Sequence, residues 1–432
     1  MSPNAVGIIG IIILIFLLFA RMEIGFAMAF VGFLGFAYLG GLNAAFGILA
    51  TVPYRSLADY TVSVVPLFIF MGLIVSSTGI SKDLYRTSYK WVGHMPGGLA
   101  IATIGACAAF AAICGESMAE AATMGKVAVP EMKKYNYGTK LATGCVAAGG
   151  TLGILIPPSL GFILYAIITQ QSVGLLFMAG ILPGILLTLL FIVAVVVITK
   201  RNPQLGPAGP KVGLSEKIRS LKQTWGMFSL FVFIMGGIYV GIFTPTEAGA
   251  LGAFGAIVIT LVSRQLNWIV FKYCLRETGQ IASMIAALIV GAFIFVRFLA
   301  ISKLPFALAG FVAGLDLNPY MILLLIVFIY LLLGMFLDIL SAIILTVPVI
   351  YPTIIAMGFD PIWFGVVMVL VMELGLITPP VGMNVFVIAG VTNTPPSTVF
   401  LGVIPFVLAI IACIVIVTVF PQIATFIPNL VR

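Results

Sequence analysis

Two carboxylates lie within otherwise apolar stretches of this 432-residue chain, and they are the first candidates for chemistry. Glu116 and Asp338 each sit near the middle of a run that is long enough to enter a membrane. An acidic side chain at membrane depth is costly and usually faces a cation, a proton path or an aqueous cavity. We therefore expect both acids to bind cations, the plainer alternative being that each caps a short helix.

The backbone of two apolar runs is interrupted in the same way, by Leu-Gly, three residues and Pro-Pro. The first run contains Pro157 and Pro158, and the second contains Pro379 and Pro380. Glycine weakens a helix and proline removes a backbone donor, so neither run forms one continuous helix. In hydrocarbon, a freed carbonyl or amide is stable only where it faces protein, water or a ligand. The two breaks are therefore candidate binding sites.

Oxygen atoms near the hairpin tips and the breaks are suitable ligands for a hard cation such as Na⁺. They come from carboxylates, from carbonyls freed at glycines, and from hydroxyls, although such hydroxyls more often bond to their own helix. The predicted ion-binding residues are Glu116, Ser117, Gly149, Gly150, Thr151, Asp338, Ser341, Gly375 and Thr378.

The helix N-termini beyond each break favour a carboxylate, because their unpaired amides and positive dipole ends attract anions. We expect these N-termini near Ser159 and Val381. The predicted substrate-binding residues are Pro157, Pro158, Ser159, Pro379, Pro380, Val381 and Asn384. For Asn384, a role in packing between helices is the simpler alternative.

The two breaks belong to an internal repeat with an offset of 222 residues (380 minus 158). The same spacing places Glu116 on Asp338. It also aligns outlying residues without a gap, namely Pro130 with Pro352, Gly180 with Gly402 and Pro183 with Pro405. Paired broken helices in matching positions of two halves are typical of the binding site of a secondary transporter.

Three further polar residues are candidates for a role. Glu373 occupies the place of Thr151 in the repeat, as a third buried acid or as a partner of polar backbone. Arg297 can bind a carboxylate, but its position near the outer end of a span favours an interfacial location. The only histidine, His94, lies in a predicted interfacial helix, so we expect no proton relay built on histidine.

Composition indicates an all-α polytopic membrane protein. Hydrophobic residues make up 62% of the chain and charged residues 8%, against roughly a quarter charged in soluble proteins. The net charge of +8 does not indicate nucleic acid, because the basic residues gather in short loops beside membrane segments. The five cysteines are scattered without metal-ligand spacing, so disulfides and structural zinc are not expected.

The chain divides into a first repeat (1–200), a basic connector (201–226) and a second repeat (227–432). Each repeat has five predicted crossings. Because this number is odd, the second repeat enters the membrane in the opposite orientation to the first, as an inverted repeat. The crossings are Val6–Ala20, Ile24–Gly41, Ser63–Ser77, Leu141–Ile168, Leu175–Thr199, Met227–Phe243, Ala248–Val262, Ile281–Ala300, Val366–Gly390 and Thr398–Phe420. Re-entrant hairpins are predicted at Leu99–Met132 and Pro319–Pro352, an interfacial helix at Ser81–His94, and a polar stretch at Arg264–Thr278.

The distribution of basic residues predicts the orientation. With a periplasmic N-terminus, the loops on the cytoplasmic side hold 17 of the 21 lysines and arginines. The apolar N-terminal stretch has no basic residue before it and no clear cleavage site, so we interpret it as the first span.

Six stretches resemble the large membrane subunit of tripartite ATP-independent periplasmic (TRAP) transporters, and they cover both halves. They are AATMGKVAVPEM (Ala121–Met132), AAGGTLGILIPPS (Ala147–Ser159), LFMAGILPG (Leu176–Gly184), GIYVGIFTPTEAGALGAFGA (Gly237–Ala256), GMFLDILSAIILTVPVIYP (Gly334–Pro352) and ELGLITPPVGMNVFV (Glu373–Val387). The resemblance implies an elevator-type, Na⁺-driven importer of organic acids such as C4-dicarboxylates, keto acids or sialic acid in the bacterial inner membrane. It implies as partners a small membrane subunit of four spans and a periplasmic substrate-binding protein, with Na⁺ as the coupling ion and no other cofactor.

The chain departs from this family in its first hairpin. The family usually has Gly-Ser-Ser followed by Ala-Thr, where this chain has two added acids, Glu116 and Glu120. These acids can strengthen cation binding, add a proton step or offset a neighbouring lysine. The alternatives to TRAP transport are a stand-alone Na⁺- or H⁺-coupled anion symporter, a membrane-embedded enzyme and a pore. The enzyme is disfavoured by isolated acids and a single histidine, and the pore by re-entrant tips that suit occlusion.

Overall fold

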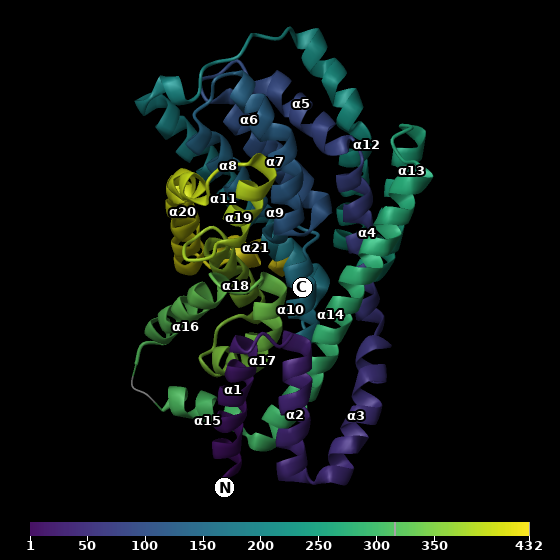
Figure 1. Ribbon diagram of the computed structural model, residues 1–432, viewed down its shortest axis with the longest axis vertical. Helices are drawn as coiled ribbons and strands as arrows, with labels where there is room; N and C mark the ends of the chain where they lie inside the picture. Colours follow the sequence, from purple (N-terminus) through teal and green to yellow (C-terminus); the bar gives the residue numbers. More distant parts are fainter. Residues whose placement is uncertain (315–316, 432) are drawn as a thin grey trace.

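All regular elements in the described residues, 1–314 and 317–431, are helices in this computed structural model (Figure 1). Residues 315–316 and 432 of the predicted second repeat lie outside this range. The first half contains α1 (Pro3–Phe19), α2 (Ile24–Gly40), α3 (Leu42–Leu57), α4 (Val64–Ser77), α5 (Ile80–Val92), α6 (Gly98–Cys114), α7 (Ser117–Lys134), α8 (Thr139–Gly150), α9 (Leu152–Leu155), α10 (Leu160–Thr169) and α11 (Val173–Arg201), with 3₁₀ helices at Tyr60–Ser63 and Pro203–Leu205.

Several helices of the second half match helices of the first half at an offset of about 222 residues, although the single helix α14 stands where the first half has α3 and α4. It contains α12 (Leu214–Tyr239), α13 (Pro245–Val262), α14 (Trp268–Ser302), α15 (Leu304–Ala313), α16 (Pro319–Gly334), α17 (Ile339–Ala356), α18 (Pro361–Leu376), α19 (Met383–Thr392), α20 (Pro396–Val419) and α21 (Gln422–Val431). Adding 222 to the bounds of α7 gives 339 and 356, which are the bounds of α17. Figure 1 places α5 and its counterpart α15 at opposite ends of the molecule.

Seven described helical stretches are long and apolar enough to cross a membrane, and an eighth qualifies if the bent helix α12 is counted. Ten crossings were expected from the sequence. The helices α1 and α2 are apolar but have only 17 residues each, and the second broken run is divided into two shorter helices. That each of the two predicted hairpins enters and leaves the membrane on one side stays a prediction.

Several boundaries differ from the sequence-based expectation. The helix α3 was missed because its mixed polar and apolar residues do not make an apolar run. The polar stretch expected at Arg264–Thr278 is mostly helical, since it forms the first turns of α14. The expected connector, 201–226, ends in helix from Leu214 onward. The interfacial helix α5 ends at Val92, so His94 lies in the turn that follows.

The helices form two groups, which we call the layer (α1–α4 with α12–α14) and the bundle (α6–α11 with α16–α21); Figure 1 shows the layer on its right side and lower half. The layer is closely packed, because Gly25 in α2 and Gly291 in α14 let the two backbones touch. In the bundle, Gly144 of α8 lies against the carbonyl of Gly402 in α20. Both groups therefore contain helices from both halves.

Candidate functional site

The first break separates α9 from α10. The chain leaves helix at Ile156 and passes through a cis Pro157–Pro158 bond. It then re-enters helix at Leu160, where the hydroxyl of Ser159 accepts a hydrogen bond from the Phe162 amide at 3.3 Å. This cap satisfies one of the free amides of α10, and Pro157, Pro158 and Ser159 are buried.

The first hairpin tip is seated directly on this break. The Leu160 amide donates a hydrogen bond to the Gly115 carbonyl at 3.2 Å. Gly115 has a φ of +68°, and a Cβ added there would lie 2.8 Å from the carbonyl oxygen of Pro158. Glycine is required at this position both for its backbone conformation and for the close approach. The tip between α6 and α7 and the first break thus form one unit.

Glu116 and Asp338 occupy the same place in their two hairpins, where each is the N-cap of the second helix. The carboxylate of Glu116 accepts hydrogen bonds from the amides of Met118 and Ala119 at the start of α7. The carboxylate of Asp338 accepts one from the amide of Ser341 at 2.9 Å. Both acids therefore cap helices, which is the simpler of the two roles considered for them. Their remaining lone pairs are still free for a cation.

A second pair of acids lies deeper than the caps, and we call Glu116, Ser117, Glu120 and Glu373 the acidic centre. Glu120 and Glu373 have no exposed surface, although they come from different halves. The hydroxyl of Ser117 donates to Glu373 Oε1 at 2.6 Å. Among the described residues, the oxygens of Glu120 have no partner other than the thiol of Cys107, and Oε2 of Glu373 has none.

The acidic centre is surrounded by further acids and thiols rather than by basic groups. Glu120 interacts electrostatically with Glu373 and Glu116, and Asp338 acts on Glu116. The thiols of Cys107 and Cys114 on α6 also face it. No lysine or arginine within residues 1–314 and 317–431 forms an ion pair with any of these acids. A buried negative charge without a partner is unstable, so the centre requires a bound cation or protons.

The second break is more open than the first. The helix α18 ends at Leu376, and α19 begins at Met383 rather than near Val381. Pro379 and Pro380, joined by a cis bond, are exposed. Gly375 packs against the backbone of Gly334, which joins this break to the second hairpin. Both breaks therefore contact the hairpin of their own half but differ in exposure.

The remaining predicted ligands comprise two threonines, two glycines and Asn384. The hydroxyls of Thr151 and Thr378 donate to carbonyls of their own helices, those of Ala148 and Leu374. Gly149 and Gly150 lie against α6 and α7, where an added Cβ would meet Cys107 and Ala121. Asn384 is fully buried, and its two polar atoms have no partner in the described part of the chain. An unpartnered amide does not fit a pure packing role.

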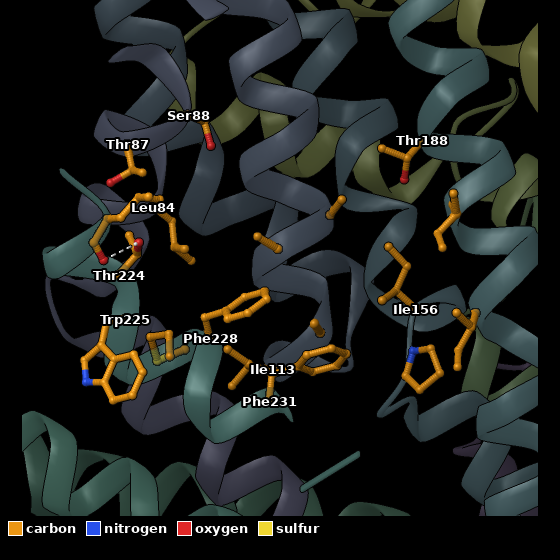
Figure 2. A pocket seen from close by; sticks show the side chains of 18 of the residues that line it. Leu84, Thr87, Ser88, Ile113, Ile156, Thr188, Thr224, Trp225, Phe228 and Phe231 are labelled. Atoms are coloured by element: carbon orange, nitrogen blue, oxygen red, sulfur yellow. Dashed lines mark hydrogen bonds between the residues drawn. The ribbon is translucent and has the colours of Figure 1, made fainter. Parts of the chain in front are cut away.

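Two cavities of similar size lie beside this region. One has a volume of about 730 Å³ and reaches Pro157, one of the predicted substrate residues. Figure 2 shows Phe228 and Phe231 of α12 near Ile113, with Ile156 across the cavity. Its lining contains no charged side chain. The other, of about 670 Å³, is lined partly by Arg55 and Arg297 and lies between the layer and α10.

The repeat aligns Glu116 with Asp338 and predicts one cation site in each half. The structure brings Glu116 and Ser117 of the first hairpin together with Glu373 of the second half. Sequence reasoning gave Glu373 two equal interpretations and noted Glu120 only as a departure from the family. Their separation of 253 residues (373 minus 120) left no local pattern to detect. The one available signal was the presence of three glutamates in largely apolar stretches.

Comparison with known proteins gives a consistent assignment. Residues 11–423 match the family model for the DctM component of the tripartite ATP-independent periplasmic transporter. The chain is 38% identical over 401 residues to the C4-dicarboxylate TRAP transporter large permease protein DctM of Pseudomonas aeruginosa, covering 90% of this chain and 93% of that one. It is 33% identical over 417 residues to the sialic acid TRAP transporter large permease protein SiaM of Vibrio cholerae, covering 96% of each.

A solved structure shares the fold at low sequence identity. The YdaH transporter of Alcanivorax borkumensis superposes with a TM-score of 0.67 at 15% identity, covering 88% of this chain and 89% of that chain. The resemblance seen in the six sequence stretches is thus confirmed over most of the chain. The chain belongs to the family of large permease subunits, the DctM component, of the tripartite ATP-independent periplasmic transporters.

Proposed function

We propose that this chain imports an organic acid across the bacterial inner membrane, driven by the entry of Na⁺. The observation that carries the proposal is the acidic centre, where Glu120 and Glu373 are fully buried without a basic partner. Carboxylate and hydroxyl oxygens at such a place favour a hard cation. Because the centre joins the first hairpin tip to a helix of the second half, a bound cation stabilises that junction.

Two Na⁺ sites follow from the repeat. In the first half, the proposed ligands are the oxygens of Glu116, Ser117, Gly149, Gly150 and Thr151, with the buried carboxylates of Glu120 and Glu373 beside them. In the second half, they are those of Asp338, Ser341, Gly375 and Thr378. The amides of α10 and α19 next to the two breaks supply the anion site, with Ser159, Val381 and Asn384 nearest to it. A cation beside each break would reinforce carboxylate binding there.

The transported substrate is an organic acid in this proposal, because the matched relatives are named for C4-dicarboxylate and sialic acid. The proposed partners are a small membrane subunit and a periplasmic binding protein that delivers the substrate. The N-terminus is placed in the periplasm, since the basic loops then face the cytoplasm. Movement of the bundle against the layer would carry the anion and its cations together, as in an elevator.

The test uses proteoliposomes that contain this chain with its small subunit, supplied with the binding protein outside. Uptake of a labelled acid is measured against external Na⁺ concentration. The variants Glu120→Gln and Glu373→Gln are each expected to raise the Na⁺ concentration for half-maximal uptake about tenfold, since each removes a charge from a desolvated site. Glu131→Gln is the matched control, because that glutamate is partly exposed and pairs with Lys134.

Unchanged Na⁺ dependence in both variants would exclude these acids from ion coupling. Uptake driven equally well by a proton gradient without Na⁺ would show that the coupling ion is H⁺ and not Na⁺. Leaving out the binding protein and the small subunit tests the alternative of a stand-alone symporter. Full uptake by the chain alone would favour that alternative over TRAP-type transport.

A further inference from the structure

The cavity of about 670 Å³ between the layer and the bundle contains two arginines without partners. Arg55 on α3 and Arg297 on α14 both line it. Neither guanidinium forms a hydrogen bond or an ion pair with another described residue. Arg297 lies near the end of α14, Arg55 lies in the last turn of α3, and both side chains are exposed and able to meet a ligand in the cavity. Two such groups facing one cavity indicate a site for an anion.

The other polar groups of the cavity do not neutralise this pair. The carboxylate of Asp59 accepts a hydrogen bond from the Thr61 amide at 2.8 Å, and its single charge balances one arginine at most. The side-chain amide of Gln170 donates to the carbonyl of Ile167 at 2.8 Å, which leaves its oxygen free. The cavity therefore keeps an excess positive charge, unlike the uncharged cavity beside Pro157.

The position of the cavity connects it to the first break. Its walls come from α2, α3 and α14 of the layer and from the last turn of α10 in the bundle. The helix α10 begins at the break and has ten residues, so its two ends are about 15 Å apart. A ligand in this cavity touches both groups of helices and lies one short helix away from the proposed substrate site.

We propose that this cavity is a second anion site, in which an arriving organic acid is held by Arg55 and Arg297 before it reaches the breaks. Arginine presents a planar fork that binds a carboxylate through two parallel hydrogen bonds. The volume falls in the range of small-molecule sites. The hydroxyls of Thr51 and Ser56 in its lining donate to carbonyls of their own helix, so toward such an acid they act as acceptors for its hydroxyl groups. The proposal rests on the proposed function for its substrate class only.

The first experiment measures binding without transport. The complex of the chain with its small subunit is placed in nanodiscs of zwitterionic lipid, and its melting temperature is followed with increasing succinate or N-acetylneuraminate. Arg55→Gln and Arg297→Gln are each expected to weaken the stabilisation by the acid about tenfold in concentration. Arg55→Lys is expected to retain part of it, because it keeps the charge without the fork. Arg276→Gln, an exposed arginine on α14, is the control and is expected to change nothing.

The second experiment measures uptake in proteoliposomes. Both glutamine variants are expected to raise the apparent KM for the acid about tenfold while the Na⁺ dependence stays that of the unaltered chain. If the proposed function is wrong, the unaltered chain itself will show no Na⁺-driven uptake of the acid. The second anion site is overturned if the double variant binds the acid with unchanged affinity. It is also overturned if phosphatidylglycerol, and no carboxylate, stabilises the complex through these arginines, since the ligand is then a lipid phosphate.

Discussion

At the scale of residues, the acidic centre places three glutamates and one serine where a soluble protein would bury aliphatic groups. The hydroxyl of Ser117 is the one hydrogen-bond donor that reaches Glu373 among the described side chains. Because both residues are fully buried, no solvent can replace this bond if it is lost. The serine therefore determines how well the carboxylate of Glu373 is held in position.

Ser117→Ala is expected to lower the stability of the complex by about 1–3 kcal/mol, because it leaves both oxygens of Glu373 without a donor. The melting temperature in detergent measures this change. Added Na⁺ is expected to raise the melting temperature of the unaltered chain more than that of the variant. Ser283→Ala is the matched control, since that hydroxyl is exposed and bonds only to its own helix. Equal melting temperatures for Ser117→Ala and the control would contradict this role.

Part of the candidate site was predictable from the sequence and part was not. Glu116 and Asp338 stood out because acids are rare in apolar runs, and their capping role follows from the helix starts beside them. Asn384 was given packing as its simpler role, whereas its buried polar atoms lack partners. Contacts between side chains from different halves, such as Ser117 with Glu373, depend on the packing of the whole bundle.

At the scale of elements, proline and glycine carry the local information that the sequence reveals best. The breaks at Pro157 and Pro379 are fixed by backbone chemistry within a few residues, so their positions agree with the structure. The helices α3 and α21 lack a purely apolar run, and α15 is short, so all three escaped a search for spans. Helices of this kind are recognised by what they pack against rather than by their own composition.

Gly144→Ala tests the close contact of α8 with α20. The added Cβ would lie 2.2 Å from the carbonyl oxygen of Gly402, so the two helices must separate. We expect a loss of stability of about 1–3 kcal/mol and a lower melting temperature. Gly390→Ala in α19 is the control, because nothing lies within 4 Å of a Cβ added there. If Gly144→Ala is as stable as the control, the close contact between α8 and α20 is not needed for stability.

At the scale of the whole molecule, the layer and the bundle differ in how they are joined. Within the layer, α2 and α14 touch through glycines along their length. Between the layer and the bundle lie cavities, one of them lined by Ile168 of α10 and by Ala292 of α14. If transport moves one group against the other, linking across this boundary stops it, whereas linking inside the layer does not.

The cysteine pair Ile168→Cys and Ala292→Cys, joined by a short bifunctional reagent, is expected to reduce uptake at least tenfold. Reduction of a cleavable reagent is expected to restore it. The pair Gly40→Cys and Ile301→Cys lies within the layer, where a Cβ at position 40 is 3.2 Å from Ile301, and its cross-link is expected to leave uptake intact. The five native cysteines are first replaced by alanine, so that the reagent joins only the introduced pair. Full uptake by the first cross-linked pair would rule out relative movement of the two groups.

The unequal exposure of the two proline pairs has a further consequence. Helices with matching bounds surround both pairs, yet Pro157 and Pro158 are covered while Pro379 and Pro380 are open. Two halves with similar structures can exchange their surroundings with a small difference in free energy between the two resulting conformations, because each half can adopt the environment of the other. If transport alternates between two such arrangements, the counterpart of this structure has the second proline pair shielded and the first accessible.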